Sequence, residues 1–521
     1  MSLLPFLAVA FGAGSLSLLA RRAERASAAI GLVGLVAAAV MAAAIGTDAP
    51  LAVAGGAIAG SQFARLFLLL GCVAGTLVVI VALATTWPRS LPGATLIGLG
   101  AAGFALGVTD PGTAVVAATG GAVVGILVTL VAPVTERGLV VAVRELRALV
   151  LAGAIALLAA ATIVGPIGAG RADPAILGLG YVAFAAAAAI RFGAIPFHPW
   201  AARVADAAPE VGLPLVMAWG PAAFMVIALA WTNAAVTPAG EPLGLERGLI
   251  VVVGVASVLL GTAAALLQDD IEHIVGYSIV ADGGIALLGL AALDPAAWGP
   301  TRTWLLALVV TKTAFAAWAA AMRAAFGTRR IPELSGWATR APLLAVALLA
   351  IIVAGVGWPG MSAFAARGTL VDLVLQGPPA TALLLGALAS VLYYGRLLAV
   401  GIGRPSGFVA ATESDSPESS RPTRLAARSF NPAAVWRVNR TPIAAIAVLL
   451  LAGLSVAVAG GALGVAVAAE ALPPARSEAP GGVQPSPVGS GVPSGSRAAP
   501  TASGAAGATA APSSSVAAPG G

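Results

Sequence analysis

The sequence is poor in the residues that build redox and metal centres. Its 521 residues include one cysteine, Cys72, and two histidines, His198 and His273. A single cysteine forms neither an intrachain disulfide nor an iron–sulfur site, and two histidines are too few for a haem pair or a zinc cluster. No strand pattern is evident, and no glycine-rich nucleotide motif follows one. We therefore expect no cofactor on this chain.

Charged residues are also scarce. They make up 10% of the chain against 59% hydrophobic residues, and the mean hydropathy is +0.98, whereas soluble domains are about a quarter charged. The net charge of +6 comes from arginines scattered along the chain, not from a basic face with aromatic residues, which argues against a nucleic-acid partner. Composition therefore predicts an all-α polytopic membrane protein in contact with the lipid bilayer.

Apolar runs of membrane-spanning length recur from end to end and predict about fourteen transmembrane helices. The segment 341–375 is interrupted at Gly355–Gly360, and such a break within a bilayer is tolerated where it is buried or lines a cavity. The first run has its charges after it rather than before it, which favours a retained helix over a signal peptide. The predicted spans are 2–20, 26–46, 64–86, 90–108, 112–134, 146–169, 174–193, 208–233, 246–267, 272–293, 302–324, 341–375, 378–402 and 441–469.

Two segments have a composition that is not typical of membrane helices. Residues 404–440 are rich in Ser, Pro and Arg, and residues 471–521 are Ala/Pro/Ser/Gly low complexity, which cannot bury enough apolar surface to fold. We therefore divide the chain into a transmembrane domain at 1–403, a cytoplasmic linker at 404–440, a C-terminal helix at 441–470 and a disordered tail at 471–521.

Arginines are unevenly distributed between the predicted loops. Loops after odd-numbered helices hold most of them, and the positive-inside rule then places the first loop in the cytoplasm and both termini outside the cell membrane. The predicted location is the inner (plasma) membrane. One cytoplasmic loop breaks the trend, because Asp269, Asp270 and Glu272 bring acid and no arginine. The arginine-rich loops contain, among others, Arg21, Arg144, Arg203, Arg323, Arg329 and Arg340.

Lys312 is the one lysine in the chain, and it lies within the apolar run 303–322. Arginine cannot give up its proton in a protein, whereas a buried lysine can. About ten apolar or small residues on each side make snorkelling to an interface strained. Ionisable residues inside a membrane are functional hypotheses by default, so Lys312 is predicted to be a group that must deprotonate.

Arg191 and His198 belong to one polar cluster at predicted membrane depth. Arg191 ends an apolar run, and Pro196 and Pro199 prevent a regular helix after it. His198 is the side chain in this segment that titrates near neutrality. The alternative interpretation is an interfacial turn with an aromatic anchor, and composition alone favours that alternative.

Three further polar residues lie within or beside apolar runs. Asp282 follows a loop, 269–273, that is most simply solvated, but two turns into a helix its own carboxyl must be paired, protonated or wetted. Arg367 comes just after the predicted helix break. Arg396 is most simply a side chain that snorkels to the cytoplasmic side.

These residues together form a string of charged or titratable groups across the middle of a helical bundle. Such strings are typical of proton paths, where water bridges sites whose proton affinity shifts with their neighbours. The predicted path contains Lys312, Asp282, Arg191, Arg367 and His198.

The same residues lie in motifs that resemble a known family. The chain is similar to the antiporter-like membrane subunits of complex I, the proton-pumping NADH–quinone oxidoreductase, and to subunit N in particular. The order and spacing of the motifs match over roughly 64–402. The motifs are Pro196-Phe-His-Pro-Trp200, Ala265-Leu-Leu-Gln-Asp-Asp-Ile271 with Tyr277-Ser278, Lys312-Thr-Ala-Phe315, Ile331-Pro-Glu-Leu-Ser-Gly336, Phe364-Ala-Ala-Arg367, and Ser390 to Arg396.

The resemblance implies two inverted repeats, each with a broken helix at the bilayer midplane, and a row of buried lysines and a glutamate. This sequence departs from that row. Arg191 and Arg367 stand at two of the lysine positions, and a third falls at about Pro221. The segment 112–134 has no acidic residue for the expected glutamate, and Asp282 stands where a histidine is usual. Lys312 remains as a lysine.

Our leading hypothesis is a non-redox membrane subunit of a complex-I-like NADH–quinone oxidoreductase that takes part in redox-coupled proton translocation. Its partners would be other membrane subunits of a respiratory or hydrogenase-like complex, and it would move protons or Na⁺. One alternative is a subunit of an Mrp-type cation/proton antiporter or a membrane-bound hydrogenase. Another is a structural membrane subunit that does not conduct.

Overall fold

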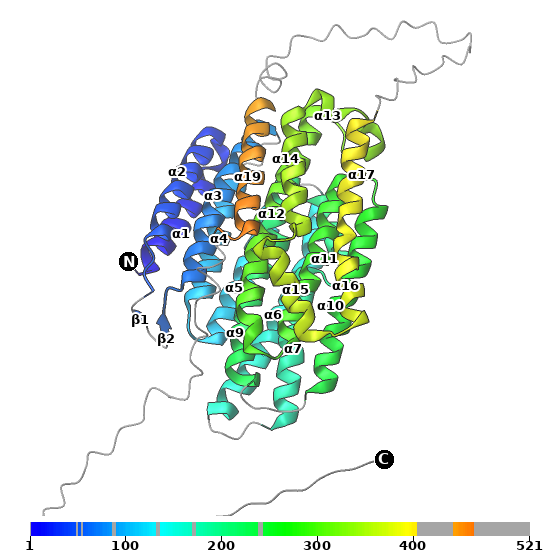
Figure 1. Ribbon diagram of the computed structural model, residues 1–521. Helices are drawn as coiled ribbons and strands as arrows, with labels where there is room; N and C mark the ends of the chain where they lie inside the picture. Colours follow the sequence, from blue (N-terminus) through cyan, green and yellow to red (C-terminus); the bar gives the residue numbers. More distant parts are fainter. Residues whose placement is uncertain are drawn as a thin grey trace, which may run out of the picture. The chain divides into compact units, whose positions relative to one another are not determined.

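The computed structural model consists mainly of α-helices (Figure 1). It describes residues 2–47, 51–53, 56–85, 90–131, 136–168, 173–237, 243–403 and 441–462. The predicted linker 404–440, the tail 471–521 and the end of the predicted helix 441–470 lie outside these residues. The prediction of an all-α polytopic membrane protein is confirmed.

The elements of the first half run from the N-terminus to Val236. Several helices end in single π-helical or 3-10 turns, which are labelled η. In order they are α1 (Leu4–Leu19), η1 (Ala20–Arg22), α2 (Glu24–Ala43), β1 (Leu51–Val53), β2 (Gly56–Ile58), α3 (Gln62–Thr85), α4 (Leu91–Gly107), α5 (Pro111–Ile126), η2 (Leu127–Val131), α6 (Glu136–Gly168), α7 (Pro174–Phe192), α8 (Pro199–Ala207), η3 (Glu210–Gly212), η4 (Leu215–Trp219), α9 (Gly220–Trp231) and η5 (Thr232–Val236).

The second half contains the longest fully buried helix and the last helix of the chain. In order its elements are α10 (Gly244–Leu267), α11 (Ile271–Ala291), η7 (Pro295–Ala297), α12 (Trp298–Phe326), η8 (Ile331–Leu334), α13 (Trp337–Arg340), α14 (Pro342–Ile352), η9 (Val353–Gly357), α15 (Ser362–Val374), α16 (Pro378–Leu388), α17 (Ser390–Ile402) and α19 (Thr441–Gly460).

Each of the fourteen predicted spans coincides with a helix. Among the described residues, twelve helices are long and apolar enough to cross a membrane, and α4 is a shorter apolar helix of 17 residues. The remaining predicted span, 146–169, lies within the 33-residue helix α6. The count of about fourteen therefore agrees with the helices found, because long apolar runs in water-free surroundings satisfy their backbone groups as helices.

A short hairpin of β1 and β2 is a feature of the described residues that the sequence did not predict. The strands are antiparallel, with Leu51 opposite Ile58, and Ile58 also forms a bridge to Val108 after α4. Strands of three residues are too short to show an alternating pattern, so periodicity could not reveal them.

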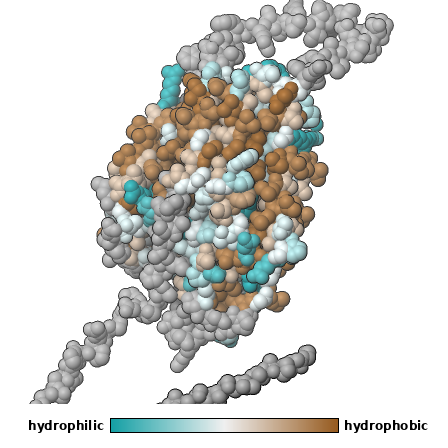
Figure 2. All heavy atoms as spheres, viewed as in Figure 1, coloured by the Kyte–Doolittle hydropathy of each residue, from teal (hydrophilic) through white to brown (hydrophobic). Residues whose placement is uncertain are grey.

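Helix α12 forms the centre of the described bundle. All residues of its most apolar 18-residue stretch are buried. In the corresponding stretches of α14–α15 and of α16–α17, only a third of the residues are buried. Helix α19 returns to pack against α12, α3 and α14 (Figure 1). Leucines such as Leu245, Leu19 and Leu179 are largely exposed, and apolar residues cover much of the face in Figure 2. These exposed side chains are the expected contacts with lipid.

Among the described membrane helices, two are broken at positions where glycine permits the break. Helix α7 ends at Gly193, whose φ of 64° is left-handed, before the short helix α8. Helix α14 ends in the π-helical turn η9, and Gly357 and Gly360 have φ values of 73° and 95° before α15 begins. Glycine adopts these angles without a Cβ clash. The predicted interruption at Gly355–Gly360 is therefore confirmed.

Close backbone packing joins α10 and α11, and it predicts a large effect for a small substitution. A Cβ atom at Gly284 of α11 would lie 2.6 Å from the carbonyl oxygen of Gly254 and 2.9 Å from the nitrogen of Val258 on α10. Small residues allow membrane helices to approach in this way. We expect Gly284→Ala to lower the free energy of unfolding by about 1–3 kcal/mol, measured as a lower midpoint of thermal unfolding in nanodiscs.

Gly248 on α10 provides the matched control, because nothing lies within 4 Å of the Cβ that alanine would add there. Gly248→Ala should leave the midpoint unchanged or raise it slightly, since alanine favours a helix by up to about 1 kcal/mol. A midpoint for Gly284→Ala as high as that of Gly248→Ala would contradict the packing.

Candidate functional site

Lys312 lies in the middle of α12 and is 1% exposed. The helix continues for fourteen residues before it and fourteen after it, because Ala, Leu, Val, Trp and Phe fill most of these positions. Gly327, with a φ of 75°, ends the helix. A lysine at this depth cannot reach either end of the helix, which excludes the snorkelling interpretation for this residue.

Asp282 of α11 is the partner of Lys312. Its Oδ2 lies 2.7 Å from Lys312 Nζ, and the Asp282 side chain is 17% exposed. Trp304, two turns before Lys312 on α12, donates its indole N–H to the Asp282 carbonyl oxygen over 3.0 Å. The sequence singled out both charged residues, and the structure brings them together as one buried ion pair.

Arg367 adds a second positive charge beside this pair. It is 2% exposed on α15, which packs against both α11 and α12, and its charge interacts with Asp282. The guanidinium lies 5.4 Å from the ring centre of Phe364 and 5.9 Å from that of Trp304. Its Nε and Nη2 atoms have no hydrogen-bond partner in the described part of the chain. Asp282 is therefore under the influence of two buried cations.

Tyr394 of α17 is a neighbour of Lys312 that the sequence did not single out. It is fully buried and interacts electrostatically with Lys312. A Cβ atom at Gly355 would lie 3.0 Å from the Tyr394 hydroxyl and 3.3 Å from Thr311, so the break in α14 lets Tyr394 approach the backbone. The motif Ser390 to Arg396 contains Tyr394, but its side-chain direction could not be known without the fold.

Several polar atoms around the ion pair lack a protein partner. Besides Arg367, the hydroxyls of Tyr394, Thr311 and Ser390 are buried and form no hydrogen bond with another described residue. Buried hydroxyls of this kind are usually hydrogen-bonded to ordered water. The surroundings of Lys312 therefore suit a hydrated path for protons.

Arg191 lies in a different part of the bundle. It is 1% exposed on α7, and it donates to the Ala118 carbonyl over 3.2 Å and to the Thr119 hydroxyl over 2.7 Å, both on α5. Its guanidinium also lies 4.3 Å from the ring centre of Phe224. Among the described residues, no carboxylate pairs with it and no bond joins it to Lys312. Arg191 is a fixed positive charge that holds α5 and α7 together.

His198 is likewise apart from the Lys312–Asp282 pair. It precedes α8, and its Nδ1 atom is buried without a hydrogen-bond partner in the described structure. Nearby, Trp200 donates its indole N–H to the Ile190 carbonyl over 2.7 Å. No hydrogen bond or ion pair among the described residues connects His198 with Asp282 or Lys312, so the structure does not bring the five predicted site residues into one cluster.

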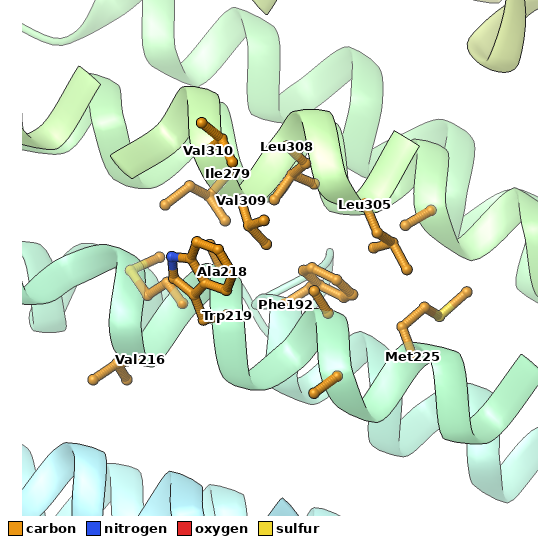
Figure 3. Close-up of a cluster of buried hydrophobic side chains, with 14 of the residues drawn as sticks. Phe192, Val216, Ala218, Trp219, Met225, Ile279, Leu305, Leu308, Val309 and Val310 are labelled. Atoms are coloured by element: carbon orange, nitrogen blue, oxygen red, sulfur yellow. The ribbon is translucent and has the colours of Figure 1, made fainter. Parts of the chain in front are cut away.

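An apolar cluster is formed by buried side chains from α7, η4, α9, α11 and α12 (Figure 3). Helix α9 contacts both α7 and α12, and Trp219 at its start is joined to Thr313 by a 2.9 Å hydrogen bond. Pro221, near the position where the resemblance implies a lysine, is buried in the first turn of α9. The labelled side chains are Phe192, Val216, Ala218, Trp219, Met225, Ile279, Leu305, Leu308, Val309 and Val310.

The acidic loop before α11 differs from the expectation of a solvated segment. The Ile271 N–H donates to the Arg329 carbonyl over 3.1 Å, and the Ile331 N–H donates to the Asp269 carbonyl over 2.8 Å. These bonds attach the loop to the segment after α12, and Glu272 is only 1% exposed. The expectation holds for Asp269, whose side chain is 57% exposed, but it was wrong for Glu272, because composition alone does not show the backbone that covers it.

Arg396 fastens the other side of the same loop. Its Nη1 donates to the carbonyls of Leu266 and Gln268, over 2.9 and 2.8 Å, and its Nη2 lies 2.5 Å from Asp269. The sequence suggested that Arg396 only snorkels, but its guanidinium instead caps the C-terminal end of α10, where a cation is favoured.

The fold and the buried ion pair define a class of protein. Broken helices and an intramembrane Lys–Asp pair, with further buried cations, are features of helical proteins that move ions across membranes.

The chain belongs to the NADH:quinone oxidoreductase/Mrp antiporter transmembrane family, whose family model matches residues 125–393, more than half of the chain. A relative, NADH-quinone oxidoreductase subunit N of Nitrosomonas europaea, is 28% identical over 238 residues, which are 44% of this chain and 48% of that protein. The chain thus spans about half the length of the curated relatives it matches. The family resemblance seen in the motifs is confirmed.

Solved structures show the same fold. A chain of respiratory complex I from Thermus thermophilus with bound aureothin superposes with a TM-score of 0.63 at 17% identity, over 87% of this chain and 97% of that one. A chain of the Mrp complex from Dietzia sp. DQ12-45-1b gives a TM-score of 0.65 at 21% identity, over 88% of this chain and 52% of that one. Both similar chains come from multi-subunit membrane complexes.

Proposed function

We propose that this chain is an antiporter-like membrane subunit of a complex-I-like NADH–quinone oxidoreductase and takes part in redox-coupled proton translocation. The observation that carries the proposal is the buried Lys312–Asp282 pair, at 2.7 Å, in the one region where the chain keeps a lysine. The proposed coupling to NADH and quinone rests on the family match and on the subunit N relatives.

The Lys312–Asp282 pair can load and release a proton through small movements. A lysine held against a carboxylate keeps its proton, whereas burial without that partner favours the neutral amine. Arg367 interacts with the same carboxylate, so a shift of Asp282 towards Arg367 would free Lys312 to release its proton. A change of one pKa unit corresponds to only about 1.4 kcal/mol, which movements of neighbouring subunits can supply.

Conduction in this proposal is restricted to the second half of the chain. Arg191 cannot give up its proton, and its helix and α12 both contribute apolar side chains, among them Phe192 and Leu305, to the cluster of Figure 3. A structural, non-conducting subunit would show the same two features, so they are consistent with that alternative as well. The alternative has no role for a buried lysine, whose burial is costly.

An Mrp-type cation/proton antiporter, or a membrane-bound hydrogenase, is the second assembly in which this chain would fit. The fold similarity to the Dietzia Mrp chain favours it. The pair of Lys312 and Asp282 offers no oxygen-rich cage of the kind that Na⁺ would need, and protons are therefore the proposed ion.

The arginine-rich loops support a location in the inner (plasma) membrane with both termini external. In this orientation Arg203, Arg323, Arg329 and Arg340 face the cytoplasm. We propose that redox cofactors reside on partner subunits and that this chain holds none.

The test is to purify the tagged full-length chain from its own membranes in mild detergent and identify what accompanies it. Quinone-oxidoreductase subunits, together with proton uptake in reconstituted vesicles that requires an electron donor, are the expected result. Ion exchange without any electron donor would move the assignment to an antiporter. An intact redox assembly that pumps equally well with Lys312→Arg would support the structural role instead.

A further inference from the structure

A second buried ionic cluster lies at the end of α12, away from the Lys312–Asp282 pair. Glu210, at the start of η3, and Glu272, at the start of α11, are each 1% exposed. Both carboxylates contact the same nitrogen, Nη1 of Arg323, at 2.7 and 3.4 Å. Arg329 forms a further ion pair with Glu272. Two carboxylates that share one guanidinium nitrogen must lie close together.

The positive charge in this cluster does not balance the acid. Asp270 lies 3.9 Å from Arg329 and 3.7 Å from His273, so three carboxyl groups, those of Glu210, Glu272 and Asp270, share two guanidinium groups. When carboxylates lie within a few ångströms of each other and away from water, their repulsion favours the binding of a proton by one of them. With Asp206, which lies 3.1 Å from His273, the carboxyl groups outnumber the cationic groups even when His273 is charged.

The geometry points to Glu210 and Glu272 as the place for that proton. The Oε2 atom of Glu210 is buried and has no hydrogen-bond partner in the described part of the chain. Both carboxylates lie against the same Arg323 nitrogen, at 2.7 and 3.4 Å, and two ionised carboxylates this close repel each other, so a proton on one of them, donated to the other, would relieve the repulsion. No group of three or more His, Cys, Asp or Glu side chains in the described residues could hold a metal ion instead.

The cluster has a connection to the outside. His273 follows Glu272 on α11, is 17% exposed, and lies 3.1 Å from Asp206 of α8. Histidine titrates near neutrality and can pass protons to a carboxylate. Arg323, which is 48% exposed, and Arg203 of α8 lie at the same arginine-rich end, so the cluster opens towards the side proposed to be cytoplasmic.

Two helices link the cluster with the Lys312–Asp282 pair. Glu272 and Asp282 are ten residues apart on α11, and Arg323 and Lys312 are eleven apart on α12, which places the two centres about 15 Å apart. Buried hydroxyls lie between: Tyr393 interacts with Ser278 of α11 and with Tyr394. Tyr394 in turn interacts with Lys312.

We propose that Glu210 and Glu272 hold one proton between them and form the proton-loading site that supplies the Lys312–Asp282 pair from the arginine-rich end of α12. The transport role of this site rests on the proposed function above, whereas the shared proton does not. The pair is a proton-binding site of its own, made by residues from η3 and α11.

Infrared spectroscopy of the full-length chain in nanodiscs tests the shared proton directly. A protonated carboxyl gives a C=O stretching band that shifts in D₂O. We expect such a band in the unmodified protein, and we expect both Glu210→Gln and Glu272→Gln to remove it, because the carboxylate that remains is then neutralised by Arg323. Glu333→Gln is the control, since Glu333 is 50% exposed and pairs with Arg330 at 3.5 Å on the surface. A band that survives both single variants would overturn the proposal.

Proton uptake by vesicles that contain the assembled complex tests the loading role. We expect Glu272→Gln to slow uptake about tenfold, equivalent to one pKa unit of lost proton affinity, and Glu272→Asp to restore most of it. Glu333→Gln, at the exposed carboxylate, should have no effect. Unchanged uptake with Glu272→Gln overturns the loading role. If Lys312→Arg leaves transport unchanged while the infrared band is still present, the proposed function fails and the shared proton stands.

Discussion

Lys312→Arg is expected to abolish proton transport while the protein still folds and assembles. Arginine can keep the ion pair with Asp282 but cannot release its proton under any condition that proteins tolerate. We expect the transport rate of the reconstituted assembly to fall about a hundredfold or more, the contribution that a positioned acid–base group makes. The measurement is donor-driven acidification of proteoliposomes, with electron transfer recorded in parallel.

Lys312→Ala is a less informative variant, and the structure explains why. It leaves Asp282 without its 2.7 Å partner in a mostly buried position, and removal of one member of a buried pair is strongly destabilising. Loss of transport in this variant could therefore result from loss of the protein. Lys312→Arg with normal amounts of assembled complex and unchanged pumping would exclude Lys312 from the proton path.

Arg323→Ala is expected to have the largest effect on stability. It removes the partner of two carboxylates that are each 1% exposed, Glu210 and Glu272. Breaking a buried pair in this way costs about 3 kcal/mol, at the low end of the usual range because Arg323 itself is half exposed. The thermal unfolding midpoint of the purified chain in nanodiscs should fall accordingly.

A second substitution distinguishes the cause of this loss. Glu210→Gln combined with Arg323→Ala should recover part of the stability, because Glu272 keeps its ion pair with Arg329 and the carboxylate that lost its partner, Glu210, is then gone. Arg330→Ala is the matched control: Arg330 is 62% exposed and pairs with Glu333 at 3.5 Å on the surface, where such pairs contribute about 0–1 kcal/mol. Equal midpoints for Arg323→Ala and Arg330→Ala would show that the buried carboxylates do not depend on Arg323.

The fold could be predicted from the sequence to a large extent. Apolar runs marked the position of each membrane helix, and Gly and Pro residues marked the break near Gly357. What hydropathy could not reveal was the arrangement of the helices, for example the return of α19 to pack against α12 and α3. Such contacts join residues more than a hundred positions apart, and a local pattern carries no information on them.

The candidate site was predicted only in part, for a related reason. The scarcity of lysine pointed to Lys312, and the cost of a buried carboxyl pointed to Asp282, but neither signal named the other residue as its partner. Glu210 and Glu272 were missed because acids next to loops are normally solvated. The one available signal was the position of Glu210 between Pro209 and an apolar run, which gives little space for water.

The sequence by itself determined that this protein is a bundle of membrane helices, that it belongs with the antiporter-like subunits, and that Lys312 is its one releasable positive charge. These properties follow from composition and from the local order of residues, since an apolar chain in a bilayer can satisfy its backbone hydrogen bonds in only a few structures. The tertiary structure decided which charges meet. It paired Asp282 with Lys312, held Arg191 of α7 by hydrogen bonds to α5, and buried Glu210 and Glu272 against Arg323. Electrostatic partners depend on distances of a few ångströms, and only the packing of the helices sets these distances.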